Sequence, residues 1–308
     1  METPHTPVLL DTVIDFFSHM GEGLMVDCTL GYGGHAEALL IKNPKMSLVA
    51  CDKDEEAIAF STRRLEPFKN RVQIIHGPFS KLLEQINISQ ISGILADIGV
   101  SSLQIDKQSR GFGLDAFSLD MRMDSRASLS AYEVVNEYAQ EALEKIFREY
   151  GELKQWRSVA QKICQAREDG PIKSAKELAI LIGKGPSKGR RVSAATLAFQ
   201  AIRIEVNNEL GELATLLASI EEASLENTRV GIITFHSLED RMVKQAFKRW
   251  QEDCTCSSFV MRCECGGGHA LGKVVTKKPI TASKEELAKN SRASSAKLRI
   301  FDRKSKNE

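Results

Sequence analysis

A glycine-rich turn near the N-terminus has the residue types that bring a backbone close to a small ligand. Residues 26–36 read Val-Asp-Cys-Thr-Leu-Gly-Tyr-Gly-Gly-His-Ala, with the glycines after a short apolar run and before a helical stretch. Glycine allows backbone conformations and close approaches that a side chain would prevent. Asp52 follows 21 positions after Gly31, where a carboxylate can accept hydrogen bonds from ribose hydroxyls. The turn and the acid together predict a site for a nucleoside-containing cofactor.

This turn would fit either NAD or S-adenosylmethionine, and the charges of the two cofactors distinguish them. Gly31, Gly33 and Ala36 also satisfy the fingerprint of dinucleotide-binding turns. A dinucleotide brings an anionic pyrophosphate to the helix N-terminus, whereas S-adenosylmethionine brings an ammonium and a sulfonium. Asp27 ends the first apolar run and Asp97 lies in the fourth, and both would face those cationic groups. A single aspartate is often only a cap, but two beside one glycine turn favour S-adenosylmethionine over NAD.

A parallel sheet is needed to position these residues, and the chain has the pattern of one. Short β-branched or apolar runs, each followed by a helical stretch or a turn, occur at 24–28, 48–51, 72–75 and 94–98. Their alternation with helices predicts βαβ units and a sheet covered on both faces. Three more strand-like runs occur at 230–235, 273–276 and 296–301. The sequence therefore predicts an α/β protein with a Rossmann-like domain.

The middle of the chain has a helical pattern instead. Apolar residues with a period of about 3.6 form one stripe, made of Val135, Tyr138, Ala142, Ile146 and Phe147. The helical pattern is broken near Gly151 and again at Gly170-Pro171. We expect the sheet domain to consist of residues 1–125 and 209–308, with an inserted all-helical domain at 126–208. Two unrelated domains in tandem would leave the strands after 230 without a sheet.

Composition and charge limit the class of protein. A chain of 308 residues that is 42% hydrophobic and 27% charged excludes disordered, collagen-like and coiled-coil proteins. The net charge is only +1, so a nucleic acid would have to bind local basic patches. No apolar run approaches the roughly 20 residues that a bilayer requires, and we see no signal peptide. We expect a cytoplasmic protein with no membrane partner and with reduced cysteines.

Several longer motifs resemble one bacterial protein family. They are Gly-Gly-His at 33–35, Asp-Ile-Gly-Val-Ser-Ser at 97–102, Gln-Ile-Asp at 104–106, Arg-Gly-Phe at 110–112, Leu-Asp-Met-Arg-Met-Asp at 119–124, Arg-Ile-Glu-Val-Asn at 203–207, Phe-His-Ser-Leu-Glu-Asp-Arg at 235–241, Lys-Lys-Pro-Ile at 277–280 and Ser-Ala-Lys-Leu-Arg at 295–299. The chain resembles the RsmH (MraW) family of 16S ribosomal RNA cytosine-N4 methyltransferases over nearly its whole length. This resemblance implies a class I methyltransferase domain with a helical insertion for substrate recognition. It also implies methyl transfer from S-adenosyl-L-methionine to a cytosine N4 amine in the decoding centre.

The resemblance also implies which residues form the site. The cofactor residues would be Gly33, Gly34, His35, Asp52, Phe79, Asp97 and Gln104. Phe79 can stack on adenine, Gln104 can bond to the methionine end, and His35 contributes its backbone. Asp97 is also the first catalytic candidate, as an acceptor for the N4 hydrogens. Further polar candidates, each of which could instead be a cap or a salt bridge, are Ser101, Asp120, Arg122, His236 and Ser237. The motif at 97–102 lacks the aromatic residue of other amino-methyltransferases, so the side chain that stacks on the base is not identified.

Two positions depart from the family. Ser193-Ala194 stand where a His-Pro pair is usual, and Leu103 stands where a proline is common. The first departure lies in or beside the helical insertion and puts a substrate role for that segment in doubt. The cofactor motifs are unaffected.

Basic clusters would have to hold the RNA backbone around an unpaired or flipped base. The first consists of Lys184, Lys188, Arg190 and Arg191, the second of Arg241, Lys244, Lys248 and Arg249, and the third of Lys297, Arg299, Arg303, Lys304 and Lys306. A basic run is usually a solvated face. Beside a base pocket, the first two are expected to contact RNA.

Four cysteines near the C-terminus form a possible metal site, and they are Cys254, Cys256, Cys263 and Cys265. Structural zinc sites favour two or more residues between paired cysteines, and here there is one. We therefore expect reduced thiols in a mobile loop and no metal.

Two other functions compete with the methyltransferase hypothesis. They are a dehydrogenase and a non-catalytic RNA-binding or zinc module. Neither explains the glycine turn together with Asp97. DNA with an accessible cytosine amine, free RNA and the assembled small ribosomal subunit all stay open as substrates, as does a homodimer.

Overall fold

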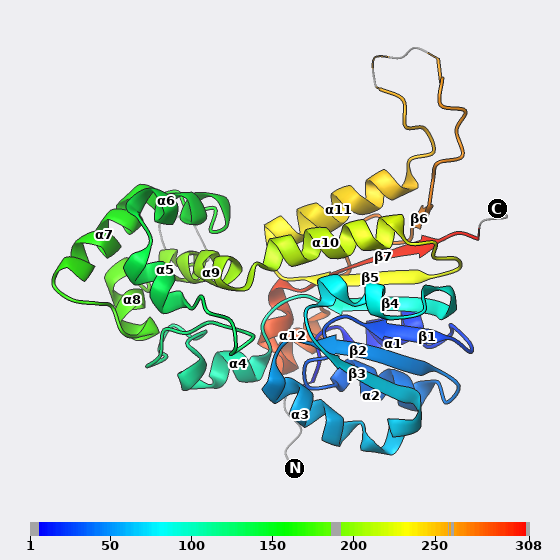
Figure 1. The fold of residues 1–308 in the computed structure, drawn as a ribbon, viewed down its shortest axis with the longest axis horizontal. Coiled ribbons are helices and arrows are strands. Elements are labelled where there is room, and N and C mark those ends of the chain that lie inside the picture. Colours follow the sequence, from blue (N-terminus) through cyan, green and yellow to red (C-terminus); the bar gives the residue numbers. More distant parts are fainter. Residues whose placement is uncertain (1–5, 186–191, 258, 260–261, 306–308) are drawn as a thin grey trace. The chain divides into compact units, whose positions relative to one another are not determined.

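The chain forms two compact units (Figure 1). The computed structural model describes residues 6–185, 192–257, 259 and 262–305. The first unit consists of Met1–Gly99 and Glu212–Glu308, and the second of Val100–Gly211. Within the described ranges, no helix combines the length and apolar character needed to span a bilayer.

A seven-stranded sheet forms the centre of the first unit. Its strands are β1 (Leu24–Asp27), β2 (Ser47–Asp52), β3 (Val72–His76), β4 (Ile91–Asp97), β5 (Arg229–Thr234), β6 (Gly272–Val274) and β7 (Lys297–Arg303). The strand order is β3-β2-β1-β4-β5-β7-β6. Strands β1 to β5 are parallel, whereas β7 runs antiparallel to both β5 and β6. Each predicted strand is present, and the predicted Rossmann-like α/β fold is confirmed.

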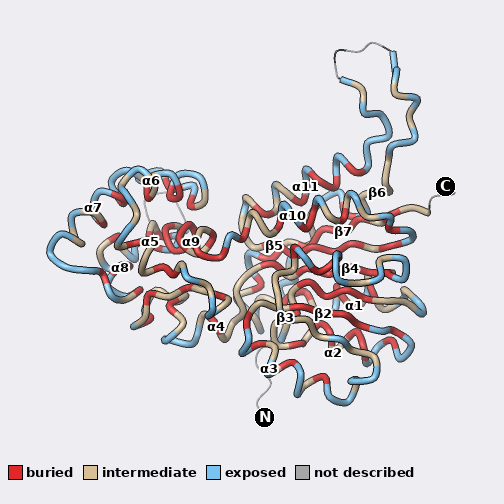
Figure 2. The backbone as a smooth tube through the Cα atoms, viewed as in Figure 1, coloured by how far each residue is buried: buried red, intermediate tan, exposed pale blue. Residues whose placement is uncertain are grey.

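Helices cover both faces of this sheet. They are α1 (Leu10–Phe17), α2 (Gly34–Lys42), α3 (Glu55–Arg64), α10 (Glu209–Glu222), α11 (Ser237–Gln251) and α12 (Lys284–Lys289). Because side chains alternate along a strand, Met25 and Val26 belong to two different apolar clusters. The cluster of Met25 includes residues of α1 and α2, and that of Val26 includes residues of α10 and α11. Figure 2 shows the central strands buried along most of their length, which explains their nearly continuous apolar sequence.

The second unit is helical and has a core of its own. Its helices are α4 (Ser102–Asp106), α5 (Ala131–Glu137), α6 (Gln140–Glu149), α7 (Trp156–Glu168), α8 (Ala175–Ile182) and α9 (Ala194–Asn207). Their buried apolar side chains form one cluster that includes Phe147, Ile163, Leu178 and Ile202. Short 3₁₀ helices occur in both units, at η1 (Glu66–Arg71), η2 (Phe79–Lys81), η3 (Leu83–Gln85), η4 (Ile88–Gln90), η5 (Gln108–Arg110) and η6 (Ser291–Ser295). The described residues of the second unit contain no strand, as the sequence predicted.

The second unit begins earlier in the chain than the predicted boundary at 126. The structure places its first residue at Val100 and its last at Gly211. Ala116, Leu119 and Met121 are buried in the helical core although they lie outside any long helix. This segment has no sustained apolar period, so periodicity could not assign it to the insertion.

The predicted helical stripe from Val135 to Phe147 is split into two helices. Helix α5 ends at Glu137, and Tyr138 has an extended backbone with φ −64° and ψ 140°. The Tyr138 hydroxyl donates to Glu205 Oε1 over 2.8 Å, and Arg167 Nη2 donates to the Tyr138 carbonyl over 2.7 Å. These long-range contacts stabilise the break, which a 3.6-residue period cannot reveal.

Candidate active site

The turn between β1 and α2 has a conformation that requires glycine. Gly33 is the N-cap of α2 with a φ of 74°, and Gly31 has a φ of 51°. A Cβ at Gly34 would lie only 2.3 Å from Cγ of Pro7. Both the left-handed backbone and the tight contact disfavour any side chain. The turn is therefore built as the sequence predicted, with the start of α2 free of side chains at 33 and 34.

Asp52 fixes this turn to the end of β2. Its Oδ2 accepts a hydrogen bond from the Gly31 amide over 2.7 Å, and its Oδ1 accepts one from the Asp54 amide over 2.9 Å. Burial raises the pKa of Asp52, and these two amide hydrogen bonds oppose the rise. Each carboxylate oxygen has a second lone pair, so Asp52 can still accept a hydrogen bond from a ribose hydroxyl.

Three carboxylates lie at the ends of neighbouring strands. Asp27, Asp52 and Asp97 are the last residues of β1, β2 and β4, and β1 lies between the other two strands. The Thr29 amide donates to Asp27 Oδ1 over 3.1 Å, and Thr29 Oγ1 accepts from the Asp97 amide over 2.6 Å. Within the described part of the chain, Asp97 Oδ1 is buried without a hydrogen-bond partner, while the charge of Lys53 acts on Asp52 and lowers its pKa. This edge of the sheet is an anionic site that suits a cationic ligand.

Burial also changes the protonation of these acids. It is the main cause that raises the pKa of Asp97 to about 8, and the charges of Asp27 and Glu239 add to the rise. Burial likewise raises the pKa of Asp27 to about 7, where the Thr29 amide opposes the rise and the Asp52 charge increases it. A cation bound among the acids would favour their charged forms.

The His35 side chain is part of this site, which is more than the backbone role that the sequence predicted. Its Nε2 lies 3.0 Å from the Val8 carbonyl oxygen, and its Nδ1 lies 3.8 Å from Asp97 Oδ2. Burial lowers the pKa of His35 to about 4, so the ring is neutral at neutral pH. Because a carbonyl only accepts, Nε2 carries the proton and Nδ1 presents its lone pair toward Asp97.

Phe79 follows the strand next to Asp52. It begins η2, three residues after His76, which is the register partner of Asp52 in the β2–β3 pair. Its ring is half-buried and packs against the cluster of Val26. Stacking on adenine stays a prediction, and packing in the core is the role that the contacts show.

His236 and Glu239 form a capping box at the start of α11. The Glu239 amide donates to His236 Nδ1 over 3.5 Å, and Glu239 Oε2 accepts from the amides of Phe235 and His236 over 2.8 and 3.2 Å. Their side chains are only 7% and 1% exposed. These contacts place His236 at the N-cap of α11, with its Nε2 3.0 Å from Glu239 Oε1, and Ser237 is the first residue of the helix. A catalytic role for His236 stays a prediction. Sequence reasoning missed Glu239, although a glutamate three residues after an N-cap is a recognisable signal.

Four other predicted site residues lie in the helical unit. Ser101 and Gln104 form a capping box on α4, in which each side chain bonds to the backbone amide of the other over 3.2 and 2.9 Å. Asp120 and Arg122 form a bidentate ion pair, with N–O distances of 2.9 and 2.8 Å. These contacts hold the four side chains within the helical unit, and the roles predicted for them at the cofactor or the base stay predictions.

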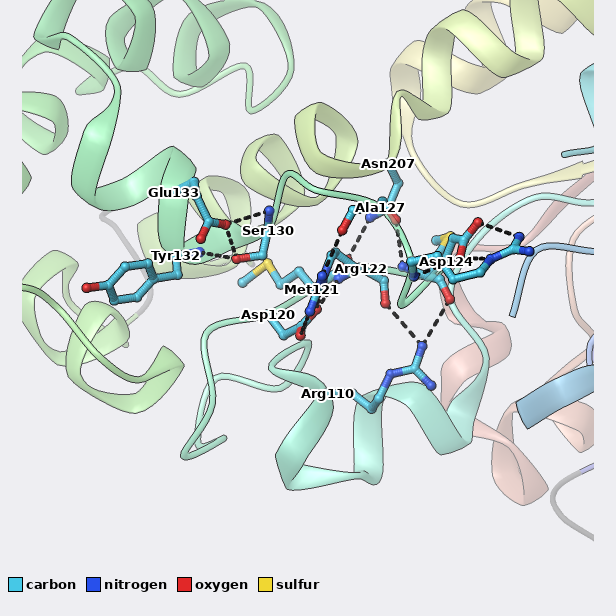
Figure 3. A network of polar contacts seen from close by, with 12 residues as sticks. Arg110, Asp120, Met121, Arg122, Asp124, Ala127, Ser130, Tyr132, Glu133 and Asn207 are labelled. Atoms are coloured by element: carbon cyan, nitrogen blue, oxygen red, sulfur yellow. Dashed lines mark hydrogen bonds and ion pairs between the residues drawn. The ribbon is translucent and has the colours of Figure 1, made fainter. Parts of the chain in front are cut away.

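Asn207 organises the loop that contains this ion pair (Figure 3). Its Oδ1 accepts from the Met123 amide over 2.7 Å, and its Nδ2 donates to the Met121 carbonyl over 2.7 Å. Arg122 Nη1 donates to the Ala127 carbonyl over 2.7 Å in the same network. Sequence reasoning included Asn207 only as part of a motif, and nothing in a single sequence distinguishes its role.

The predicted basic clusters differ in how far their side chains form ion pairs. In the first cluster Lys184 pairs with Asp115, while Lys188, Arg190 and Arg191 lie outside the described residues. The second cluster lies on α11 as predicted, where Arg249 pairs with Glu221, Lys248 pairs with Glu252 and Lys244 is exposed.

The basic residues of the third cluster are largely engaged in the fold. Arg299 Nε donates to Asp240 over 2.7 Å, and Arg303 donates to the Ile220 and Ala223 carbonyls over 3.0 and 2.7 Å. Both arginines are buried, and Lys306 lies outside the described residues. Arg299 and Arg303 therefore stabilise the edge of the first unit.

Comparison with known proteins gives consistent matches along the chain. A family model described as the MraW methylase family matches residues 2–304. A protein of Campylobacter concisus named ribosomal RNA small subunit methyltransferase H is 57% identical, covering 98% of this chain and 99% of its own. Relatives of the same name from Campylobacter lari and Campylobacter jejuni are 56% and 52% identical, each covering 98% of this chain and 99% and 97% of their own.

Proposed function

Because the chain belongs to the MraW methylase family, we propose that it methylates the N4 amine of a cytosine in the decoding centre of 16S ribosomal RNA. The relatives are named as methyltransferases of the small-subunit ribosomal RNA, which supports the substrate class. S-adenosylmethionine is the methyl donor. The choice of N4 and of the decoding centre rests on the resemblance of the motifs.

The observation that carries the cofactor assignment is the anionic strand edge. Asp27 is buried and Asp97 has one buried carboxylate oxygen without a hydrogen-bond partner among the described residues, and both end strands that lead to the glycine turn or lie next to it. An ammonium and a sulfonium supply the positive charge that these acids lack, whereas a pyrophosphate would add negative charge. A dehydrogenase is therefore disfavoured by the charge of the site.

We assign the remaining contacts to the residues that the resemblance implied. Asp52 accepts from the ribose hydroxyls, Phe79 stacks on adenine, and Gly33 and Gly34 give the turn at the start of α2 the shape that brings its backbone to the ligand. His35 lies beside Asp97, with its Nδ1 3.8 Å from Asp97 Oδ2, and lines the site with a neutral ring.

The chemistry needs positioning and a proton acceptor. When bound, the cofactor supplies an electrophilic methyl group and its own leaving group. Asp97 accepts the hydrogens of the N4 amine and takes up one proton as the new N–C bond forms. The positive charge of the bound cofactor favours the charged form of Asp97, which is the form that accepts this proton. Ser101, Asp120 and His236 stay further catalytic candidates.

We propose that the helical unit recognises the RNA. Phe117 is 69% exposed on this unit, although it lies between the buried residues Ala116 and Leu119. An exposed aromatic ring can stack on an unpaired base, with an effect of roughly tenfold on affinity. The variant Phe117→Ala should weaken RNA binding in a filter or fluorescence assay. Ile41→Ala, which removes another exposed apolar side chain but lies on the first unit, should leave it unchanged, and equal affinities for the two variants would contradict this role.

Methyl transfer to ribosomal particles tests the function. Radiolabelled S-adenosylmethionine is added to small subunits and to free 16S RNA, both from cells that lack the corresponding gene, and the labelled nucleoside is identified. We expect N4-methylated cytidine. Preference for one substrate answers whether assembly precedes methylation. No label in either substrate, from a protein that binds the cofactor, would contradict the proposed substrate.

A further inference from the structure

A cluster of four thiols lies in the segment between α11 and β6. The cysteine cluster consists of Cys254, Cys256, Cys263 and Cys265, and their four Sγ atoms all lie within 4.8 Å of one another. Three of these Sγ–Sγ distances are 3.6 Å. Figure 1 shows the segment extending beyond the end of α11 and returning at β6. The one-residue spacing within each pair, which led us to expect no metal, does not prevent the two pairs from meeting.

The distances fit a shared metal ion better than they fit disulfides. A disulfide holds its sulfur atoms about 2.05 Å apart, and no pair in the cluster approaches that distance. Four thiolates around one zinc ion, with zinc–sulfur bonds of about 2.3 Å, form a tetrahedron with edges of about 3.8 Å. Clusters of several iron atoms hold their thiolates farther apart.

The backbone around the cluster is arranged to stabilise thiolates. The Glu264 and Cys265 amides donate to Cys256 Sγ over 3.2 and 3.3 Å, and the Thr255 amide donates to Cys265 Sγ over 3.4 Å. The thiolate is the form of cysteine that binds metals, and outer hydrogen bonds orient such ligands.

We propose that the cysteine cluster binds one zinc ion in a closed, four-thiolate structural site. Thiolate ligands select soft ions and disfavour magnesium and calcium. Four protein ligands leave no position for a substrate or a water molecule, so the ion has no part in catalysis. The proposal is independent of the proposed methyltransferase function.

Hydrogen bonds hold the base of the segment, including those that Asp253 accepts from the Gly268 and His269 amides over 3.0 and 3.2 Å, but few buried apolar contacts order the rest. The base is also fixed by the Leu271 amide, which donates to the Trp250 carbonyl over 2.7 Å. Beyond the base, the described residues are mostly exposed, and Phe259 is 93% exposed. In many small domains, a bound metal ion orders a loop that has few buried apolar contacts.

Metal analysis of the full chain tests this proposal. The protein is produced in zinc-supplemented medium, exchanged into chelator-free buffer and measured by mass spectrometry for metals. We expect one zinc per chain in the wild type and in the control Cys164→Ser, which removes a thiol of α7 outside the cluster. We expect Cys256→Ser to lose it. Iron in place of zinc, or zinc well below stoichiometry in the wild type, would overturn the assignment.

Two measurements on the wild-type chain avoid reliance on a variant that does not fold. Cobalt added to the apo-protein should give thiolate-to-cobalt charge transfer and the ligand-field bands of a tetrahedral site. Peptide mapping after alkylation should show the four cysteines protected in the zinc form and reactive once a chelator is added. No tetrahedral spectrum and equal alkylation in both forms would each contradict the site.

Discussion

At the residue scale, the site depends on buried charge that only a ligand can neutralise. Asp97 combines an unpartnered buried oxygen, a neighbouring neutral imidazole and a second buried acid, Asp27. Each of these features disfavours the carboxylate in the empty protein. Such groups are typical of functional sites because binding or reaction relieves their unfavourable environment. Binding of the cofactor therefore offsets the free-energy cost of burying these carboxylates.

The variant Asp97→Asn tests this interpretation. It keeps the side-chain volume but removes the charge and the proton acceptor, so we expect methyl transfer to fall by about a hundredfold or more and cofactor affinity to fall as well. Asn also mimics the protonated aspartic acid, so the thermal midpoint should not decrease. Asp11→Asn, which changes an exposed acid of α1, is the control and should keep full activity. A folded Asp97→Asn protein with near-normal turnover would remove Asp97 from the mechanism.

The raised pKa values of Asp27 and Asp97 predict that cofactor affinity increases with pH. Both groups become charged as the pH rises toward about 7 and about 8, and a cationic ligand binds the charged forms. If both groups are charged in the complex, affinity for S-adenosylmethionine should increase by about two orders of magnitude between about pH 6 and about pH 7.5, with release of protons on binding. Titration calorimetry in two buffers of different ionisation enthalpy measures both effects. In Asp97→Asn the slope should be smaller, and an unchanged slope would assign the proton to another group.

The same pKa shifts have the opposite effect on the empty protein. A folded-state pKa above the unfolded value means that the folded protein binds more protons between the two values. The contribution of Asp27 and Asp97 to stability is therefore present below the unfolded value and is lost as the pH rises through about 7 and about 8. Bound cofactor should counteract this loss.

At the scale of elements, the strands could be predicted and several connections could not. Buried parallel strands have short apolar runs, and all seven runs correspond to strands. The break at Tyr138 and the inclusion of Ala116 in the helical core depend on contacts between distant residues. Part of the candidate site could also be predicted, because the glycine turn and the acids at the strand ends are recognisable in the local sequence. The capping role of Glu239 also has a local signal, whereas the meeting of the four cysteines appears only in three dimensions.

The hydrogen bonds of the Asn207 side chain are expected to stabilise the helical unit. This side-chain amide joins α9 to the loop at 121–123 through three backbone groups, those of Met121, Met123 and Arg203. Asn207→Ala leaves these groups without their partner in a buried place, so we expect the unfolding free energy to fall by about 2–4 kcal/mol. Denaturant unfolding followed by circular dichroism measures the loss. Gln161→Ala, at an exposed position of α7, is the control, and a comparable small effect of both changes would show that the network is dispensable.

At the scale of the whole molecule, the chain carries separate cores in two units. The helical cluster contains Phe147 and Ile202, and the sheet clusters contain only residues of the first unit. Units with separate cores can unfold in separate steps, so a single midpoint need not describe the protein.

The two tryptophans allow each unit to be followed alone. Trp156 begins α7 in the helical unit, and Trp250 is buried in α11 of the sheet unit. The variant Trp156→Phe therefore reports the sheet unit, and Trp250→Phe reports the helical unit. Cofactor at about 100 times its dissociation constant adds about 2.7 kcal/mol to the unit that binds it. If Asp27, Asp52 and Asp97 form the site without the helical unit, the thermal midpoint should rise by about 5 °C or more in Trp156→Phe and stay constant in Trp250→Phe.

The same pair of variants decides the role of Gln104. This residue lies in the helical unit, where its side chain already caps α4 through the Ser101 amide. If Gln104 also holds the methionine end of the cofactor, as the resemblance implies, binding links the two units and both midpoints should rise together. Gln104→Ala should then abolish the shift in the helical unit while reducing, without removing, the shift in the sheet unit. A midpoint of the helical unit that never responds to cofactor would place the complete cofactor site in the sheet unit and leave Gln104 with its capping role.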